Sequence, residues 1–408
     1  MFPPDLTRST VKAVLDHRLF STLSMLYQAM KLYFYTKSFP PDPILLQSEG
    51  TRKAVSGLAS GLAECGADVT ILCEGEEDGW FTMPEGYKIQ CFKTAQAAQT
   101  FNIPNGLKQF IQQKLDSSNI VVLSGIFQPS IYAMASHLRK CSIPYVMMPH
   151  DPYNPAIFRK NAHLKWLYWY LLERQVLKQA KAIQVLDARH GAFLRSLKIN
   201  TPIIEVPNGF SPADVHSEDT LSWNTDDSPP QFFFLGRIDA HNKGLDLLLD
   251  AFAQIPKATN PKLTLQGVDK GDRQRLEKRA VALAIANRTR FLNPDYTVST
   301  PLLIKNYDVF CLPSRFEGFG LSALEAMLAG RVLLVSEVAG IAPHVQASGC
   351  GVIVSPTVAA IRQGLMELLE RRSEWKEMGL KGREYTFEHL RWDKISAHAL
   401  ERYRQLVL

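Results

Sequence analysis

The sequence predicts an α/β fold in which two domains, each built on a parallel sheet, face a central cleft. Short apolar runs alternate with helical patterns along most of the 408 residues. This alternation occurs twice, before and after a polar stretch rich in Asp, Ser and Pro at residues 211–230. Strands that alternate with helices form parallel sheets covered by helices. Ligands of such sheets bind beyond the carboxyl ends of the strands, so we expect the functional site between the domains.

The N-terminal segment is predicted to form a helix over residues 10–36. Five apolar side chains recur there at helical spacing: Leu19, Leu23, Leu26, Met30 and Tyr33. Prolines after residue 39 end the pattern, and residues 1–40 carry five basic and two acidic side chains. This helix either lies on an anionic membrane surface or packs on its own domain or a partner subunit, and the sequence leaves both open.

The two alternating patterns predict the remaining strands and helices. In the first pattern, strands are expected at 44–47, 69–73, 119–123, 145–148 and 182–186, and helices at 51–64, 129–140 and 161–180. In the second, strands are expected at 232–235, 262–266, 290–291, 308–312 and 332–336, and helices at 245–255, 272–286, 300–305, 322–328 and 358–372.

These patterns divide the chain into five segments. We expect a helical extension at 1–43, a Rossmann-like domain at 44–207, a linker at 208–230, a second Rossmann-like domain at 231–385 and a final helical segment at 386–408. The turn residues Val-Pro-Asn-Gly, which end at Gly209, mark the boundary between the first domain and the linker.

The composition is that of a globular chain with more than one core, with 46% hydrophobic and 21% charged residues. None of the six cysteines forms Cys-x-x-Cys, so a zinc site is not indicated and a reducing cytoplasm is expected. The net charge of +6 is only moderately basic, and no nucleic-acid-binding module is recognised. We expect neither a membrane-spanning helix nor a secretory signal, since no apolar run is long enough.

The segment at residues 313–330 is the most informative. Gly318 and Gly320 lie in a loop that follows a predicted strand and precedes a helix near Ser322. Glycines let a backbone approach a ligand closely, and the unpaired N–H groups of a helix start suit a phosphate. Glu317 precedes this helix and Glu325 lies about one turn inside it, so the two carboxylates can hold opposite ends of one ligand, including a sugar diol.

A second segment, at residues 232–244, supplies positive charge. It is predicted to be a strand followed by a loop that contains Arg237 and Lys243. These cations can neutralise a diphosphate without a metal. The chain contains no Asp-x-Asp, so a magnesium-bound nucleotide has no evident pair of ligands. Any one of these features alone is compatible with a purely structural role, but their occurrence together, in this order, favours a binding site.

These motifs resemble those of the family 4 glycosyltransferases, which are retaining enzymes with the GT-B fold. The likeness rests on Gly-Arg…Lys-Gly at 236–244, on two glutamates with seven residues between them at 317–325, and on Val-Pro-Asn-Gly at 206–209. It continues more weakly through 339–354 and 392–394 and covers roughly residues 44–408. It implies an acceptor-side first domain, a second domain that binds the nucleotide sugar, and a last helix that crosses back to the first domain.

The resemblance also implies roles for individual residues. Arg237 and Lys243 would hold the donor diphosphate, Glu325 the ribose, and Glu317 the transferred sugar. The donor-binding set is Gly236, Phe319, Gly320, Leu321, Ser322 and Glu325, and the catalytic set is His150, Arg237, Lys243 and Glu317. The loop at 292–296 would lie near the nucleobase.

The acceptor side is less regular than in the family. His150 matches a histidine that lies near the sugar, although a buried structural histidine explains it as well, and Asp151, Gly50 and Thr51 are further acceptor-side candidates. The first loop, 47–52, lacks the usual paired glycines, and the loop at 339–344 lacks a glutamate that many relatives carry.

The implied function is the retaining, metal-independent transfer of a sugar, expected to be a hexose, from a nucleoside diphosphate sugar to a glycan or lipid-linked acceptor. No cofactor is expected beyond the donor as co-substrate. The alternative is a non-catalytic GT-B module that binds a nucleotide sugar or a protein partner. The unusual first loop, 47–52, is the reason for considering it. A dinucleotide-dependent oxidoreductase would need Gly-x-Gly-x-x-Gly after the first strand, and residues 44–52 lack that pattern.

A further basic segment, 158–182, carries six basic side chains, one acidic side chain and several aromatic residues. Aromatic residues beside bases suit the boundary of an anionic membrane, so peripheral contact, at the inner face of a membrane, is one interpretation. The other is that four leucines form a core face while the bases are solvated: Leu164, Leu167, Leu171 and Leu172.

Overall fold

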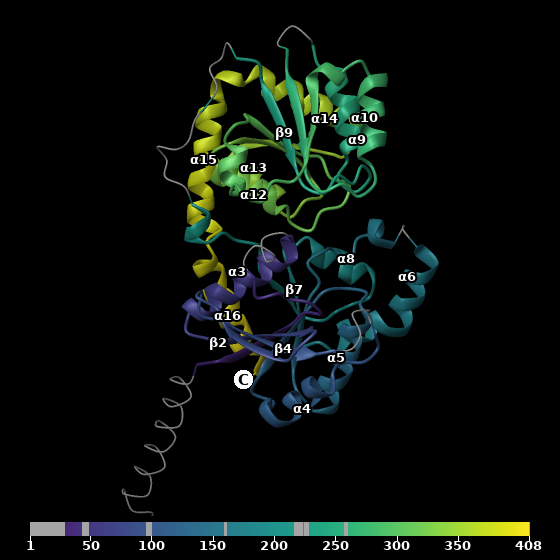
Figure 1. Ribbon diagram of the computed structural model, residues 1–408, viewed down its shortest axis with the longest axis vertical. Coiled ribbons are helices and arrows are strands. Elements are labelled where there is room, and N and C mark those ends of the chain that lie inside the picture. Colours follow the sequence, from purple (N-terminus) through teal and green to yellow (C-terminus); the bar gives the residue numbers. More distant parts are fainter. Residues whose placement is uncertain are drawn as a thin grey trace, which may run out of the picture.

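The computed structural model describes residues 29–42, 49–94, 100–158, 161–215, 223, 228–256 and 260–407. These residues form two lobes, each with its own sheet, and the last helices of the chain run along one side from the C-terminal lobe to the N-terminal lobe (Figure 1). Helices lie on both faces of each sheet, so the predicted fold of two facing parallel-sheet domains is confirmed.

The N-terminal lobe is built on an eight-stranded sheet in the order β3-β4-β2-β1-β5-β6-β7-β8. Its strands are β1 (Lys31–Tyr35), β2 (Asp68–Gly75), β3 (Gly79–Thr82), β4 (Lys88–Lys93), β5 (Ile120–Ser124), β6 (Tyr145–Met148), β7 (Ala182–Val185) and β8 (Ile203–Glu205). Neighbouring strands pair in parallel, except for the antiparallel pair of β3 and β4 at one edge.

The helices of this lobe cover both faces of the sheet. They are α3 (Gly50–Glu64), α4 (Asn105–Lys114), α5 (Pro129–Lys140), α6 (Ala162–Tyr168), α7 (Arg174–Gln179) and α8 (His190–Ser196), with a 3-10 turn η1 (Pro155–Phe158) and a π-helical turn η2 (Trp169–Glu173). Side chains of β1 alternate between the faces, as strand geometry requires. Leu32 and Phe34 join the core beneath α3, whereas Tyr33 and Tyr35 join the core beneath α4 and α5.

The C-terminal lobe is built on a six-stranded, all-parallel sheet in the order β11-β10-β9-β12-β13-β14. Its strands are β9 (Gln231–Leu235), β10 (Lys262–Gln266), β11 (Thr289–Leu292), β12 (Val309–Leu312), β13 (Val332–Ser336) and β14 (Gly351–Val354). Its helices are α9 (Leu245–Ala253), α10 (Arg273–Ala282), α11 (Thr300–Ile304), α12 (Leu321–Leu328), α13 (Ala342–Ser348), α14 (Val358–Glu370) and α15 (Trp375–His389). The strand order reverses between β9 and β12, which is where open parallel sheets bind ligands.

The last helix, α16 (Trp392–Val407), packs on the N-terminal lobe. The Ser396 hydroxyl donates to the Leu58 carbonyl of α3 at 3.5 Å, and the Tyr403 hydroxyl donates to the Gln184 side chain of β7. The chain therefore crosses between the lobes twice, once at the linker and once before α16. None of the helices in the described ranges is both long and apolar enough to cross a bilayer.

The predicted start of the first sheet is wrong. Residues 31–35 form the central strand β1, paired with β2 and β5, and not the end of a helix. Their aromatic side chains favour a strand, and pairing on both sides outweighs the helical spacing of the apolar residues. The N-terminal sheet thus begins inside the segment assigned to the extension. Residues 1–28 of that extension and the strand expected at 44–47 lie outside the described residues.

Candidate active site

The two loops predicted to hold phosphate are bound to each other. They follow the neighbouring strands β9 and β12, and the Asn242 carbonyl accepts hydrogen bonds from the amides of Arg315 and Phe316 at 2.9 and 3.2 Å. The Arg315 guanidinium also donates to both carboxylate oxygens of Asp246, at 2.7 and 2.8 Å. A bidentate pair of this kind fixes orientation as well as distance, so the loops behave as one unit.

The charged side chains of these loops meet directly. The Lys243 ammonium donates to Glu317 Oε2 at 2.7 Å, and the Ser314 hydroxyl donates to the same oxygen at 3.1 Å. Both members of the ion pair are about one-eighth exposed. Arg237 is exposed at the start of the loop, and among the described residues its side chain has no hydrogen-bond or ion-pair partner. Its positive charge is therefore available to an anion.

The start of α12 lies beside this cluster. Its N-cap, Gly320, has φ of 105°, and no side chain in the described structure caps the helix. The conformation favours glycine, and a Cβ there would also lie 2.7 Å from the Leu312 side chain. The uncapped N–H groups of Leu321 and Ser322, with the helix dipole, suit an anion. Phe319 is buried beneath the loop, and its carbonyl accepts from the Ile341 amide at 2.9 Å.

Glu325 faces the other lobe. Lys53, in the first turn of α3, donates to Glu325 Oε1 at 2.6 Å and lies 3.2 Å from Asp214 Oδ1 of the linker. Burial alone would lower the pKa of Lys53, but the two carboxylates outweigh it and raise that pKa, so the lysine is charged. The glutamate predicted to bind ribose is therefore in contact with a lysine that the sequence did not single out.

His150 lies where the lobes touch. A Cβ on Gly318 would lie 2.2 Å from the His150 carbonyl oxygen, so glycine is required for this approach. His150 itself has φ of 62°, an uncommon backbone conformation for a residue with a side chain, and its Nε2 lies 2.8 Å from the Ser124 hydroxyl. Burial lowers the pKa of His150 to about 4, so the imidazole is neutral near pH 7.

Asp151 faces the loops that follow β9 and β12. Burial, followed by the nearby negative charge of Glu317, raises its pKa to about 6, while Lys243 and Arg237 act in the opposite direction. The structure thus brings Arg237, Lys243, Glu317 and Asp151 within electrostatic reach of one another. Because the carboxyl group titrates near neutral pH, its charge state responds to whatever binds in the cleft.

Three other predicted positions are less closely tied to this cluster. Gly50 begins α3, and a Cβ on it would lie 3.4 Å from Leu321, so the starts of α3 and α12 approach each other. Thr51 is exposed in the same turn. Gly236 follows β9, and its amide donates to the Gln266 carbonyl at 3.0 Å. No group of three or more side chains suited to a metal ion occurs in the described part of the chain.

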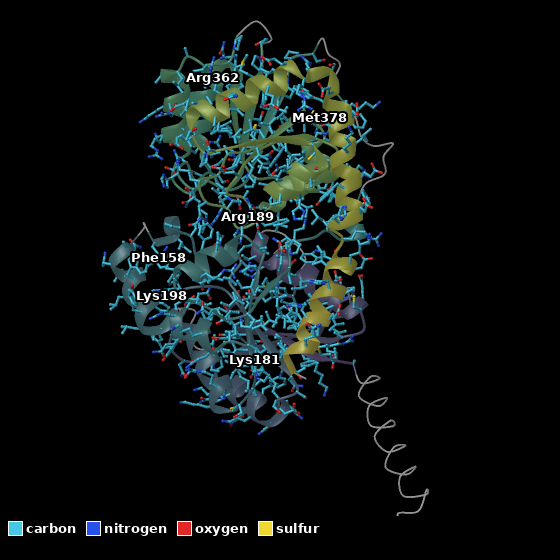
Figure 2. The ribbon with its side chains drawn as sticks, turned by 180° about the vertical axis from the view of Figure 1, so that it is seen from behind. Phe158, Lys181, Arg189, Lys198, Arg362 and Met378 are labelled. Atoms are coloured by element: carbon cyan, nitrogen blue, oxygen red, sulfur yellow. The ribbon has the colours of Figure 1, made fainter. Side chains whose placement is uncertain are left out.

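Arg189 makes a cross-lobe contact that sequence reasoning missed. Its guanidinium donates to the carbonyls of Glu337 and Ala339 at 3.0 and 2.9 Å and pairs with Asp187 in its own lobe. Figure 2 shows Arg189 between the two lobes. No motif pointed to it, because its partners are backbone carbonyls far away in the sequence.

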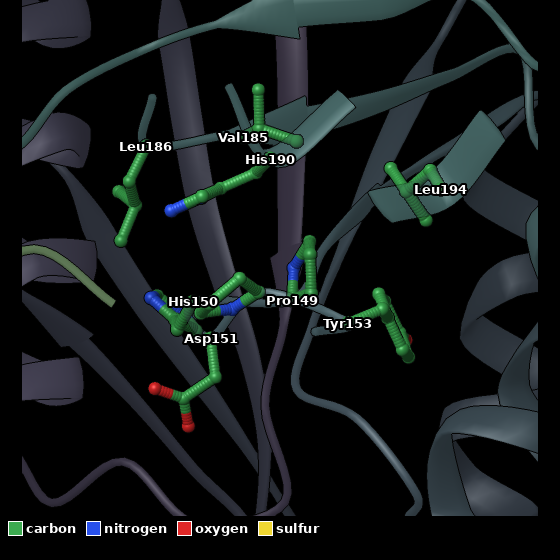
Figure 3. Close-up of a pocket in the computed structure, with 9 residues that line it drawn as sticks. Pro149, His150, Asp151, Tyr153, Val185, Leu186, His190 and Leu194 are labelled. Atoms are coloured by element: carbon green, nitrogen blue, oxygen red, sulfur yellow. The ribbon is translucent and has the colours of Figure 1, made fainter. Parts of the chain in front are cut away.

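A small pocket on the N-terminal side holds a second histidine that the sequence did not single out. His190 lines it together with Pro149, His150, Asp151 and Tyr153 (Figure 3). Its volume of about 10 Å³ is room for about one water molecule. The His190 imidazole is buried, its Nε2 has no hydrogen-bond partner among the described residues, and burial lowers its pKa to about 4. The N-terminal side of the cleft thus carries two neutral histidines.

Two facing parallel-sheet lobes, with a basic loop and a glycine-flanked helix start at their cleft, define the GT-B class of glycosyltransferases. A family model described as "Glycosyl transferases group 1" matches residues 217–385, and one described as "Glycosyl transferase 4-like domain" matches residues 49–209. The chain belongs to the family 4 type of GT-B glycosyltransferases and is a glycosyltransferase.

Two proteins with similar sequences are also described as glycosyltransferases. An uncharacterized glycosyltransferase of Methanocaldococcus jannaschii is 24% identical over 404 residues, which is 92% of this chain and 98% of that protein. Phosphatidyl-myo-inositol mannosyltransferase of Mycobacterium tuberculosis is 31% identical over 181 residues, 42% of this chain and 46% of that protein.

Two solved structures share the fold. Sucrose-phosphate synthase of Thermosynechococcus elongatus superimposes with a TM-score of 0.72 at 18% identity, over 92% of this chain and 99% of that one. Anabaena HepE, solved with UDP and glucose, has a TM-score of 0.67 at 16% identity, over 91% of this chain and 99% of that one.

Proposed function

We propose that the protein transfers a hexose from a nucleoside diphosphate sugar to a glycan or lipid-linked acceptor, with retention at the anomeric carbon and without a metal ion. The observation that carries this proposal is the cluster of Arg237, Lys243 and the uncapped start of α12. Positive groups from one loop and a helix end converge there at the carboxyl edge of the C-terminal sheet.

The cluster suits the charge that develops on a leaving diphosphate. Lys243 is held by Glu317, and the loop that carries it is fixed by Asn242, so its position does not have to be organised during the reaction. Arg237 is free to pair with phosphate oxygens in two parallel hydrogen bonds. Preorganised positive groups of this kind supply a large share of catalysis in many enzymes, and no metal is needed to place them.

Retention is proposed through attack on the face from which the diphosphate leaves. The bond from the anomeric carbon to the phosphate oxygen breaks, the bond to the acceptor oxygen forms, and the acceptor proton passes to the departing diphosphate. Glu317 is engaged by Lys243 and Ser314, which supports a binding role for this carboxylate over that of a covalent nucleophile. A role for His150 on the sugar side is supported by its neutral imidazole, which can accept a hydrogen bond.

A panel of nucleoside diphosphate sugars tests this function. UDP-glucose is the first donor to include, since the similar HepE was solved with UDP and glucose. We expect one donor to raise the melting temperature and to release its nucleoside diphosphate, at the same rate with and without EDTA. Proton NMR of the product should show the anomeric configuration of the donor. An inverted product contradicts retention, and binding without turnover favours the alternative, a non-catalytic module that binds a nucleotide sugar.

We also propose that α6 and η2 touch an anionic membrane, which would bring the enzyme to a lipid-linked acceptor. Leu164, Leu167 and Leu171 are 57 to 58% exposed and Tyr170 is 62% exposed, whereas Trp169 is buried. The alternative in which the leucines form a core face is therefore wrong for these three.

The distribution of charged side chains also supports the proposed membrane contact. The acidic residue of this segment, Glu173, is buried, where it accepts a hydrogen bond from the Tyr153 hydroxyl at 2.5 Å. Lys178 and Lys181 are exposed, and Lys198 is exposed on the same side of the lobe as Phe158 in Figure 2. An exposed apolar stripe on a lobe that also carries exposed bases suits an interface with anionic lipid.

A further inference from the structure

One ion pair crosses the cleft at the carboxylate proposed to bind the donor. Lys53 of the N-terminal lobe donates to Glu325 Oε1 at 2.6 Å. The side chains are 25% and 11% exposed, so the pair is shielded from water more than a surface ion pair is. A ribose diol normally occupies both oxygens of a carboxylate, and one oxygen of Glu325 is already taken by the lysine.

Lys53 has a second carboxylate within reach. Asp214 Oδ1 lies 3.2 Å from its ammonium, and the other oxygen of Asp214 accepts from the Ser211 amide at 2.9 Å. Asp214 is therefore held in place by the linker, independently of Glu325. An ammonium group that leaves Glu325 keeps a fixed partner and is not left as an unpaired, partly buried charge, which would be costly.

The position of the pair couples it to the closure of the lobes. The starts of α3 and α12 meet next to it, where a Cβ on Gly50 would lie 3.4 Å from the Leu321 side chain. A lysine on one lobe that pairs with a carboxylate on the other favours the closed arrangement. A ligand that binds Glu325 in place of the lysine removes this stabilisation of the closed arrangement. The closed and open arrangements then become closer in free energy.

We propose that Lys53 is a latch between the lobes: it holds Glu325 while no donor is bound, and the ribose hydroxyls of the donor displace it onto Asp214. This inference rests on the proposed role of Glu325 in binding ribose. The lysine competes with the nucleotide, in contrast to Arg237 and Lys243, which attract it. Removing Lys53 therefore opens the donor-free enzyme and strengthens nucleotide binding, whereas removing Arg237 weakens it.

The variant Lys53→Met tests the latch, because methionine keeps most of the side-chain length and removes the charge. Its affinity for UDP, GDP and ADP is measured by calorimetry, and its radius of gyration without ligand is measured by small-angle X-ray scattering. We expect about three- to fivefold tighter binding of the diphosphate that the wild type prefers, in line with the strength of one partly exposed ion pair. We also expect a larger radius of gyration than for the wild type.

Lys88→Met is the matched control. Lys88 pairs with Asp68 at 2.8 Å inside the N-terminal lobe, away from the cleft, so both quantities should stay at their wild-type values. Lys53→Gln is the second variant if the methionine disturbs folding, which circular dichroism reports. Weaker or unchanged diphosphate binding by both Lys53 variants overturns the latch, as does an unchanged radius of gyration. If the wild type binds none of the three diphosphates, the proposed function fails, and the scattering comparison still decides whether Lys53 holds the lobes together.

Discussion

The two sides of the cleft carry polar groups in different states. On the C-terminal side, charged groups are paired and fixed, as in Lys243 with Glu317, and Arg237 adds an available positive charge. On the N-terminal side, burial keeps His150 and His190 neutral and raises the pKa of Asp151 to about 6. The difference fits a reaction in which the diphosphate acquires charge on one side, while an uncharged sugar and hydroxyl meet on the other.

The largest effect should come from removing charge on the C-terminal side of the cleft. We expect Arg237→Ala to lower kcat/KM for transfer by about 10²–10³-fold, since a preorganised group facing the developing charge is lost. Arg275→Ala is the control, because Arg275 lies on the exposed surface of α10, 67% exposed and paired with Asp272. Steady-state kinetics with the identified donor measure both variants. Near-normal turnover of Arg237→Ala would reject the proposed role of Arg237 in neutralising the leaving diphosphate.

The contact between the two sides should be the next most sensitive feature. Gly318→Ala places a Cβ within 2.2 Å of the His150 backbone, so the lobes must separate or the loop before α12 must shift. We expect kcat/KM to fall about tenfold or more, since small displacements of reacting groups slow catalysis strongly. Gly106→Ala, on α4 away from the cleft, whose Cβ would lie 3.4 Å from the Phe92 side chain, should stay close to wild-type activity. Equal activity of the two variants would show that the contact does not align the site.

The neutral histidines should make the N-terminal side sensitive to acid. The pKa of His190 falls from 6.5 to about 4 on folding, so the unfolded chain binds more protons between these values and stability is lost as pH falls through this window. Between pH 7 and pH 5, we expect the free energy of unfolding of the wild type to fall by about 1–2 kcal/mol more than that of His190→Asn. Urea unfolding at both pH values measures this, and an equal fall in both proteins would argue against a buried neutral histidine.

The smallest expected effect concerns the outer surface of the N-terminal lobe. Leu167→Glu introduces a negative charge into the exposed stripe of α6, so we expect it to reduce flotation with anionic vesicles several-fold. Val281→Glu, on α10 of the other lobe and 67% exposed, should leave flotation unchanged. Failure of the wild type to float with anionic vesicles at any ionic strength would exclude the membrane contact.

The fold was largely predictable because its signals are local. Most strands of the C-terminal sheet lie within a few residues of their predicted positions, since each is a buried apolar run bounded by turns. Strands β3, β4, β8 and β14 and helices α4, α8, α13 and α15 were not predicted. Strand β1 was predicted to be helical, because Met30 and Tyr33 continue an apolar helical spacing and nothing local reveals that β2 and β5 will pair with Lys31–Tyr35.

The candidate site shows the same difference between local signals and long-range contacts. By itself, the sequence determined which groups gather on the C-terminal side of the cleft, because Gly318, Gly320, Glu317 and Glu325 lie in one continuous strand–loop–helix segment with recognisable chemistry. Only the tertiary structure decided which groups oppose them. Lys53 meets Glu325 across 272 residues of chain. His190, at the start of α8, lines the same pocket as His150, which follows β6. Such contacts depend on how two separately built sheets come together, and no spacing along the chain encodes that geometry.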